Sequence, residues 1–217
     1  MAGSGLRDLL HEKEIMEETE RLKRIAGPLL DWFAGNARKL PWREKPTAYH
    51  VWVSEIMLQQ TRVEAVKPFY ARFTEALPDV KALAVCPEER LLKLWEGLGY
   101  YNRVRNMQKA AQIVTEQYDS SMPCDYEILL SLPGIGSYTA GAVASIAGGQ
   151  AVPAVDGNVL RVISRICESE EDITKQTVKR RMEEALRKVI PADQPGAFNQ
   201  ALMELGATVC LPNGAPE

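Results

Sequence analysis

The stretch LPGIGSYTAGAV, residues 132–143, decides how the chain around it is expected to fold. Its proline disfavours the helical conformation in the residue before it, so a helix is expected to end here. Gly134 and Gly136 allow a left-handed turn or a close approach of the backbone. Ser137 or Thr139 is then predicted to cap the next helix. The stretch therefore predicts two short helices joined by a tight glycine turn.

The start of that second helix is a candidate anion site. Backbone amides at a helix N-terminus lack partners within the helix and can hold a phosphate without any basic side chain. This matters because the chain carries a net charge of −3, which by itself argues mildly against a protein that binds nucleic acid. The alternative is an ordinary helix–turn–helix whose glycines only allow tight packing.

Apolar residues recur at helical spacing along most of the chain, and strand signals are almost absent. We therefore expect an all-α fold built from short helices with tight links. The stretch GGQAVPAV, residues 148–155, indicates a change of lobe. The predicted helical segments are 12–35, 49–75, 88–98, 102–118, 126–132, 137–148, 156–168, 174–190 and 197–208.

Two carboxylic residues have contrasting predicted surroundings. Glu55 lies in a helical run with mostly apolar neighbours, and burial among them would raise the pKa of its carboxyl. Asp156 opens the helical stretch DGNVLRVISR, where amides at the helix start favour an ionised side chain. Such a pair can supply an acid and an anion to one reaction. The alternatives are an exposed glutamate and a simple helix cap.

Several stretches carry a resemblance to one family: LPWR, YHVWVSEIMLQQTRVEAVKPFYARF, LWEGLGYYNRVRNMQKAA, LPGIGSYTAGAVASIA, VDGNVLRVISR and FNQALMELGATVC. They resemble the helix-hairpin-helix DNA glycosylases of the endonuclease III superfamily, and most closely its MutY branch, the adenine DNA glycosylases. The likeness runs from about residue 24 to residue 210. It implies base excision repair, with hydrolysis of the N-glycosidic bond of adenine mispaired with 8-oxoguanine or guanine.

The resemblance also implies catalytic roles. Glu55 would protonate adenine N7 and assist a water molecule, and Asp156 would stabilise the oxocarbenium ion. Relatives that also nick the strand carry a lysine at the position of Tyr138, because an amine must attack C1′. A phenol cannot form that Schiff base, so we expect a monofunctional glycosylase. Tyr138 and Asn158 would lie beside the sugar and help to position Asp156; the alternative for Tyr138 is simple packing.

The same resemblance implies contacts to double-stranded DNA. An extruded adenine would meet Trp42, Arg43 and Gln200. Gln60 and Tyr100 would enter the duplex during base flipping, although Tyr100 could instead be a core residue. The remaining implied DNA-binding residues are Leu58 and Thr61 beside Gln60, and Leu132, Gly134, Gly136 and Ser137 in the hairpin.

Members of the family usually hold a [4Fe-4S] cluster with four cysteines spaced Cys-x6-Cys-x2-Cys-x5-Cys. Cys210 matches the first of these metal ligands, and the sequence ends at Glu217 without the other three. One thiolate cannot hold such a cluster, so we expect it to be absent or incomplete here. The family's C-terminal domain, which recognises 8-oxoguanine, is also missing from this sequence, so we expect a weakened preference for 8-oxoguanine.

For architecture, the resemblance implies a six-helix barrel with the hairpin at residues 40–152, and a second lobe at 153–217 completed by 1–39. No apolar run approaches the ~18 residues that span a bilayer, and the charged N-terminus lacks the apolar core of a secretory signal. We expect a monomer in the bacterial cytoplasm, associated with the nucleoid when on DNA and not with a membrane. Two other functions stay open: a mismatch thymine or uracil glycosylase, and an inactive DNA-binding remnant.

Overall fold

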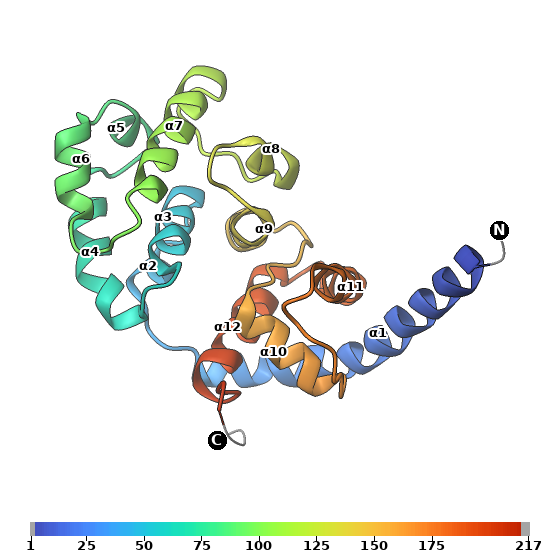
Figure 1. Ribbon diagram of the computed structural model, residues 1–217. Coiled ribbons are helices and arrows are strands. Elements are labelled where there is room, and N and C mark those ends of the chain that lie inside the picture. The colour runs from blue at the N-terminus through green and yellow to red at the C-terminus, as the bar shows by residue number, and fades with distance from the viewer. Residues whose placement is uncertain (1–2, 214–217) are drawn as a thin grey trace. The chain divides into compact units, whose positions relative to one another are not determined.

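The computed structural model describes residues 3–213, with side chains from residue 12 onward. Within this part every regular element is a helix, which confirms the all-α prediction (Figure 1). The chain divides into two compact units, one made of Met1–Arg38 and Ala151–Glu217 and the other of Lys39–Gln150. No helix among the described residues has both the length and the apolar character needed to cross a membrane.

The first unit combines the two ends of the chain. Its helix α1 packs against α11 and α12, and α10 also packs against α12. Phe198, Met182, Ile163 and Leu22 are fully buried between these helices, which makes them the centre of its apolar core. The bounds of the four helices are α1 Gly3–Asn36, α10 Gly157–Ile166, α11 Gln176–Arg187 and α12 Pro195–Thr208.

An ion cluster ties α1 to α11 in this unit. The guanidinium of Arg181 is almost fully buried and bonds the carboxylates of Glu14, Glu18 and Glu171. Its Nη1 lies 2.9 Å from Oε2 of Glu14, and its Nε lies 3.1 Å from Oε1 of Glu18. Removing one partner from such a buried pair costs about 3–5 kcal/mol, because the other charge is left uncompensated.

The second unit is continuous in sequence. Its helix α3 contacts both α4 and α9, and α5 packs against α7. Trp52, Trp95 and Phe73 are fully buried and form the centre of its core, with the Phe73 and Trp95 rings in edge-to-face contact at 5.8 Å. The bounds of its helices are α2 Pro41–Glu44, α3 Ala48–Leu58, α4 Val63–Ala76, α5 Val80–Ala84, α6 Glu88–Trp95, α7 Asn102–Gln117, α8 Tyr126–Ser131 and α9 Ser137–Ile146. Its description as a six-helix barrel stays a prediction.

The helix boundaries differ from the sequence prediction at several places. The single run predicted for 49–75 is two helices, because Gln60 adopts a left-handed backbone with φ of 58° between α3 and α4. The short helices α2 and α5 were not predicted; α2 begins with a proline, which suits the first position of a helix. Helix α1 begins at Gly3 rather than at residue 12.

Candidate active site

Glu55 is a buried carboxylic residue in the middle of α3. Thr47 is the N-cap of this helix, and its hydroxyl accepts a hydrogen bond from the amide of His50. Glu55 is 6% exposed and lies one turn beyond Val51 and Trp52, which are also buried. The structure therefore places this carboxyl in an apolar environment, as the sequence predicted, and the alternative of an exposed helix residue is wrong.

Tyr138 reaches this carboxyl from α9. Its hydroxyl donates a hydrogen bond of 2.5 Å to Oε2 of Glu55. Because α3 and α9 pack against each other, residues 83 positions apart in sequence meet at one place. The sequence had predicted Tyr138 beside the reacting sugar and had not predicted its contact with Glu55. A phenol and a buried carboxyl thus form a joined pair within the second unit.

The glycine turn joins α8 to α9 and precedes Tyr138 directly. Gly134 has φ of 78°, and a Cβ there would lie 2.7 Å from Cβ of Asn106, so glycine is required for both conformation and space. Gly136 instead has φ of −96° and is the N-cap of α9, with no side chain bonded to the helix start. The predicted capping by Ser137 or Thr139 is therefore wrong, because Ser137 is already the first helical residue. The hairpin residues Leu132 and Ile135 are buried.

Asp156 caps α10 in the first unit. Its Oδ1 accepts a hydrogen bond of 2.8 Å from the amide of Val159, and its Oδ2 accepts one of 2.9 Å from Nδ2 of Asn158. An aspartate suits this position, because its side-chain oxygens accept from amide donors that the helix N-terminus leaves unpaired. The cap predicted from the sequence is confirmed, and Asn158 does contact Asp156.

The amide of Asn158 is itself oriented from two sides. Arg161, one turn further along α10, donates to Oδ1 of Asn158 at 2.9 Å and to the carbonyl oxygen of Gly206 at 2.8 Å. Because Oδ1 accepts from Arg161, Nδ2 is directed toward Asp156. Gly206 on α12 completes this cluster, since a Cβ there would lie 2.8 Å from Cβ of Asn158. Sequence reasoning missed Arg161 and Gly206, although the spacing of Asn158 and Arg161 places both on one helix face.

Two turns in the second unit carry the residues predicted to enter DNA. Gln60 is exposed with φ of 58°, and Tyr100 is 67% exposed with φ of 45°. The alternative of a core residue is therefore wrong for Tyr100. Leu58 and Thr61 are partly buried on either side of Gln60, and the hydroxyl of Thr61 donates to the carbonyl oxygen of Gln59 at 3.3 Å.

The residues predicted to contact adenine come from both units. Trp42 and Arg43 lie on α2, and Gln200 lies on α12. Trp42 is 6% exposed, and its ring packs edge-to-face on Tyr70 with 5.4 Å between the ring centres. Arg43 and Gln200 are half-buried. Their contacts with a base stay a prediction.

Cys210 follows α12 and is buried. Its sulfur accepts a hydrogen bond of 3.0 Å from Arg165, and Arg161 donates to its carbonyl oxygen. In the described part of the chain, no group of three or more His, Cys, Asp or Glu residues could hold a metal ion. The residues described here do not fit a [4Fe-4S] cluster, and no step of the reaction below uses one.

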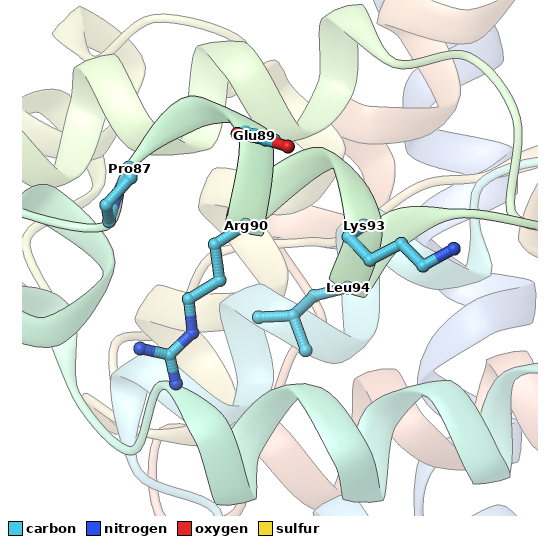
Figure 2. Close-up of a pocket in the computed structure, with 5 residues that line it drawn as sticks. All are labelled: Pro87, Glu89, Arg90, Lys93 and Leu94. Atoms are coloured by element: carbon cyan, nitrogen blue, oxygen red, sulfur yellow. The ribbon is translucent and has the colours of Figure 1, made fainter.

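One surface hollow, of 380 Å³, lies over α6 (Figure 2). It is lined by Pro87, Glu89, Arg90, Lys93 and Leu94. None of the residues predicted for catalysis or DNA binding contributes to it. The candidate residues instead form two hydrogen-bonded clusters, one around Glu55 in the second unit and one around Asp156 in the first.

Comparison with known proteins shows the family to which the chain is similar. Residues 53–188 match the family described as HhH-GPD superfamily base excision DNA repair protein. The chain is 42% identical to human adenine DNA glycosylase over 207 residues, covering 91% of this chain and 38% of the human protein. It is 38% identical to adenine DNA glycosylase of Buchnera aphidicola from Acyrthosiphon pisum, covering 84% of this chain and 53% of that protein. The chain thus spans between a third and about half of the length of these relatives.

Solved structures show the same fold. A thermostable thymine-DNA glycosylase superposes with a TM-score of 0.79 at 25% identity, covering 90% of each chain. Endonuclease III, trapped as a covalent intermediate with DNA, superposes with a TM-score of 0.75 at 23% identity, covering 91% of this chain and 90% of that chain.

Proposed function

The chain belongs to the HhH-GPD superfamily of base excision DNA repair proteins, and we propose that it is a monofunctional DNA glycosylase that removes adenine mispaired with 8-oxoguanine or guanine. The observation that carries this proposal is the buried Glu55 carboxyl joined to the Tyr138 hydroxyl at the start of the hairpin helix. The relatives named adenine DNA glycosylase support the choice of base.

The reaction breaks the bond between C1′ of the deoxyribose and N9 of adenine. Glu55 donates a proton to N7 of the flipped base, so that the base takes the electron pair of the breaking bond and departs as neutral adenine. Burial suits this role, because a carboxyl in apolar surroundings retains its proton more readily than one in water. The Tyr138 hydroxyl contributes by orienting the carboxyl through its hydrogen bond.

The sugar becomes positively charged as the base departs. Asp156, oriented by Asn158 and by the N-terminus of α10, stabilises this oxocarbenium ion. A water molecule then adds to C1′ and gives its proton to the Glu55 carboxylate, which restores the acid and leaves an abasic site and free adenine. The residue at position 138 is a tyrosine, so no amine attacks C1′ from this helix.

The hairpin and the two exposed turns provide the DNA contacts in this proposal. The start of α9 has no side-chain cap, so its amides are suited to a backbone phosphate. Gln60 and Tyr100 enter the stack where the adenine leaves it, and the exposed ring of Tyr100 supports this assignment. Trp42, Arg43 and Gln200 line the extruded adenine. We further propose that the protein acts as a monomer in the cytoplasm.

The test is excision by this chain, under single-turnover conditions, of adenine opposite 8-oxoguanine, guanine and thymine. Glu55→Gln keeps the size of the side chain and an acceptor for Tyr138, and it should lower the excision rate by about 10²–10⁴-fold with little change in folding. Glu75→Gln, which changes an exposed glutamate on α4, is the matched control and should excise like the parent.

Three outcomes would contradict the proposal. An unchanged rate for Glu55→Gln would remove the proposed acid. Borohydride trapping of the protein on its substrate DNA would show an amine intermediate instead of hydrolysis. Activity confined to thymine or uracil mispairs would favour the second candidate, which the similarity to the thymine-DNA glycosylase structure supports.

A further inference from the structure

Arg103 lies in the first turn of α7 and binds the backbone of two separate turns. One nitrogen, Nη1, donates to the carbonyl oxygens of Ile56 at 2.8 Å and Gln59 at 2.6 Å. The other, Nη2, donates to those of Leu98 at 3.0 Å and Gly99 at 3.3 Å. A single planar guanidinium therefore bridges the end of α3 and the turn between α6 and α7.

Each of these turns places one residue in a strained conformation directly after a carbonyl that Arg103 binds. Gln60 follows Gln59 with φ of 58°, and Tyr100 follows Gly99 with φ of 45°. Residues other than glycine adopt this left-handed region only when their surroundings impose it. Both residues are exposed. The bridge therefore fixes the backbone at the two places from which exposed side chains project.

The guanidinium occupies an unusual environment for a positive charge. It lies 5.4 Å from the centre of the Trp95 ring and 5.6 Å from that of Tyr100. Its Nε is buried without a hydrogen-bond partner, and burial lowers the pKa of the Arg103 guanidinium. The partners found for it in the described residues are carbonyl oxygens, with no carboxylate among them. An arginine in this position holds the two turns at a fixed distance from each other, because its planar set of N–H donors reaches both turns at once.

We propose that Arg103 is a positioning residue that fixes the turns of Gln60 and Tyr100 as one rigid wedge, so that both side chains enter the duplex together. The inference rests on the proposed function for the identity of the duplex. It adds to that function a residue that acts on DNA only through the two turns. Without the bridge, each turn would have to be ordered during the encounter with DNA, and the opened state of the duplex would be less populated.

The test is Arg103→Lys, which keeps the charge but replaces the planar fork by a single ammonium group that cannot span both turns. The probe is a duplex with 2-aminopurine next to the mispaired adenine, whose fluorescence rises when the stack is opened. We expect at least a tenfold smaller opened fraction and at least a tenfold lower single-turnover rate at saturating protein. The Kd for the duplex should change by less than about threefold.

Arg72→Lys is the matched control. Like Arg103, Arg72 lies over an aromatic ring, that of Phe69, and donates to a backbone carbonyl oxygen, but its bond is to Leu94 alone and reaches neither turn. It should leave the fluorescence and the rate unchanged. Urea denaturation of both variants tests whether they fold. If Arg103→Lys does not fold, Arg103→Gln takes its place.

A combined variant separates positioning from general damage. Because Arg103 acts through both Gln60 and Tyr100, adding Arg103→Lys to a variant that carries Gln60→Ala and Tyr100→Ala should lower neither the opened fraction nor the rate any further. The inference would be overturned if Arg103→Lys caused a further loss of duplex opening and excision in that background. It would also be overturned if the Arg103→Lys variant alone opened the duplex and excised adenine like the parent. A parent that opens the duplex without excising would overturn the proposed function and leave the fluorescence test of Arg103 intact.

Discussion

Replacing Gly206 by alanine tests whether the position of Asn158 controls the rate of the reaction. Gly206 lies inside α12, and its carbonyl oxygen accepts a hydrogen bond from Arg161. A Cβ at this position would lie 2.8 Å from Cβ of Asn158 and 3.2 Å from its backbone oxygen. The substitution changes no group that reacts or binds DNA, and yet it presses on the residue that donates to Asp156.

The change in the free energy of unfolding is the sum of two opposing contributions, helix propensity and overpacking. Alanine is favoured over glycine in a helix by about 1 kcal/mol. Overpacking a filled site costs about 1–3 kcal/mol, so the free energy of unfolding should fall by about 0–2 kcal/mol. The contact must lengthen by about 0.6 Å to reach the 3.4 Å of an ordinary contact. Because a displacement of about 1 Å near a reacting centre can cost about 10²-fold, we expect roughly a tenfold lower excision rate.

The measurement is single-turnover excision of adenine opposite 8-oxoguanine, combined with urea denaturation. Gly35→Ala is the control, because a Cβ there meets nothing within 4 Å and Gly35 lies at the exposed end of α1. It should keep the parent rate and either keep or slightly raise stability. A Gly206→Ala protein that is more stable than the parent and equally fast would refute the reasoning, since Asn158 would then not be under constraint.

Two other predictions concern the hairpin and the pH dependence of stability. Gly134→Ala combines a left-handed backbone, which costs about 1–2 kcal/mol, with overpacking against Asn106. Denaturation should show a loss of about 2–5 kcal/mol in the free energy of unfolding, and the variant should bind duplex DNA more weakly. Gly136→Ala has neither problem and should be close to the parent in stability; equal losses for the two variants would contradict the structure. Burial lowers the pKa of His50 below its ordinary value of 6.5, and Lys45 adds a smaller effect in the same direction. As the pH drops, the unfolded chain therefore takes up a proton on His50 before the folded chain does. The free energy of unfolding should fall as the pH drops below about 6.5. The Tm of His50→Gln should fall less between pH 7 and 5 than that of the parent, and parallel slopes would show that His50 is not responsible.

Part of this architecture could be predicted from local signals alone. The cap at Asp156 follows from an aspartate directly before a run with helical apolar spacing, and the structure confirms it. The burial of Glu55 follows from the apolar residues one turn away on each side. Both features depend on neighbours within a few positions of the sequence, which is the range over which helical patterns carry information.

Features that depend on distant residues were not predicted. The sequence around Gln60 continues the helical pattern, whereas at the observed break the carbonyl oxygen of Gln59 accepts a hydrogen bond from Arg103, 44 positions further along the chain. The need for glycine at 206 depends on Asn158 in another helix. Within the hairpin, the cap was assigned to Ser137 or Thr139 because those hydroxyls are common caps, whereas the extended Gly136 occupies the position instead.

The discontinuous first unit has a consequence for how the protein is made. Arg181 and Glu18 form their ion pair across 163 positions of sequence, so α1 leaves the ribosome long before the helices that cover its apolar face. The second unit is continuous in sequence, so its helices are all made before α10 and it can fold while synthesis continues. Until α11 and α12 are made, Leu22 and Leu29 lack much of the core that buries them in the folded chain, so α1 presents an apolar face to chaperones during that interval.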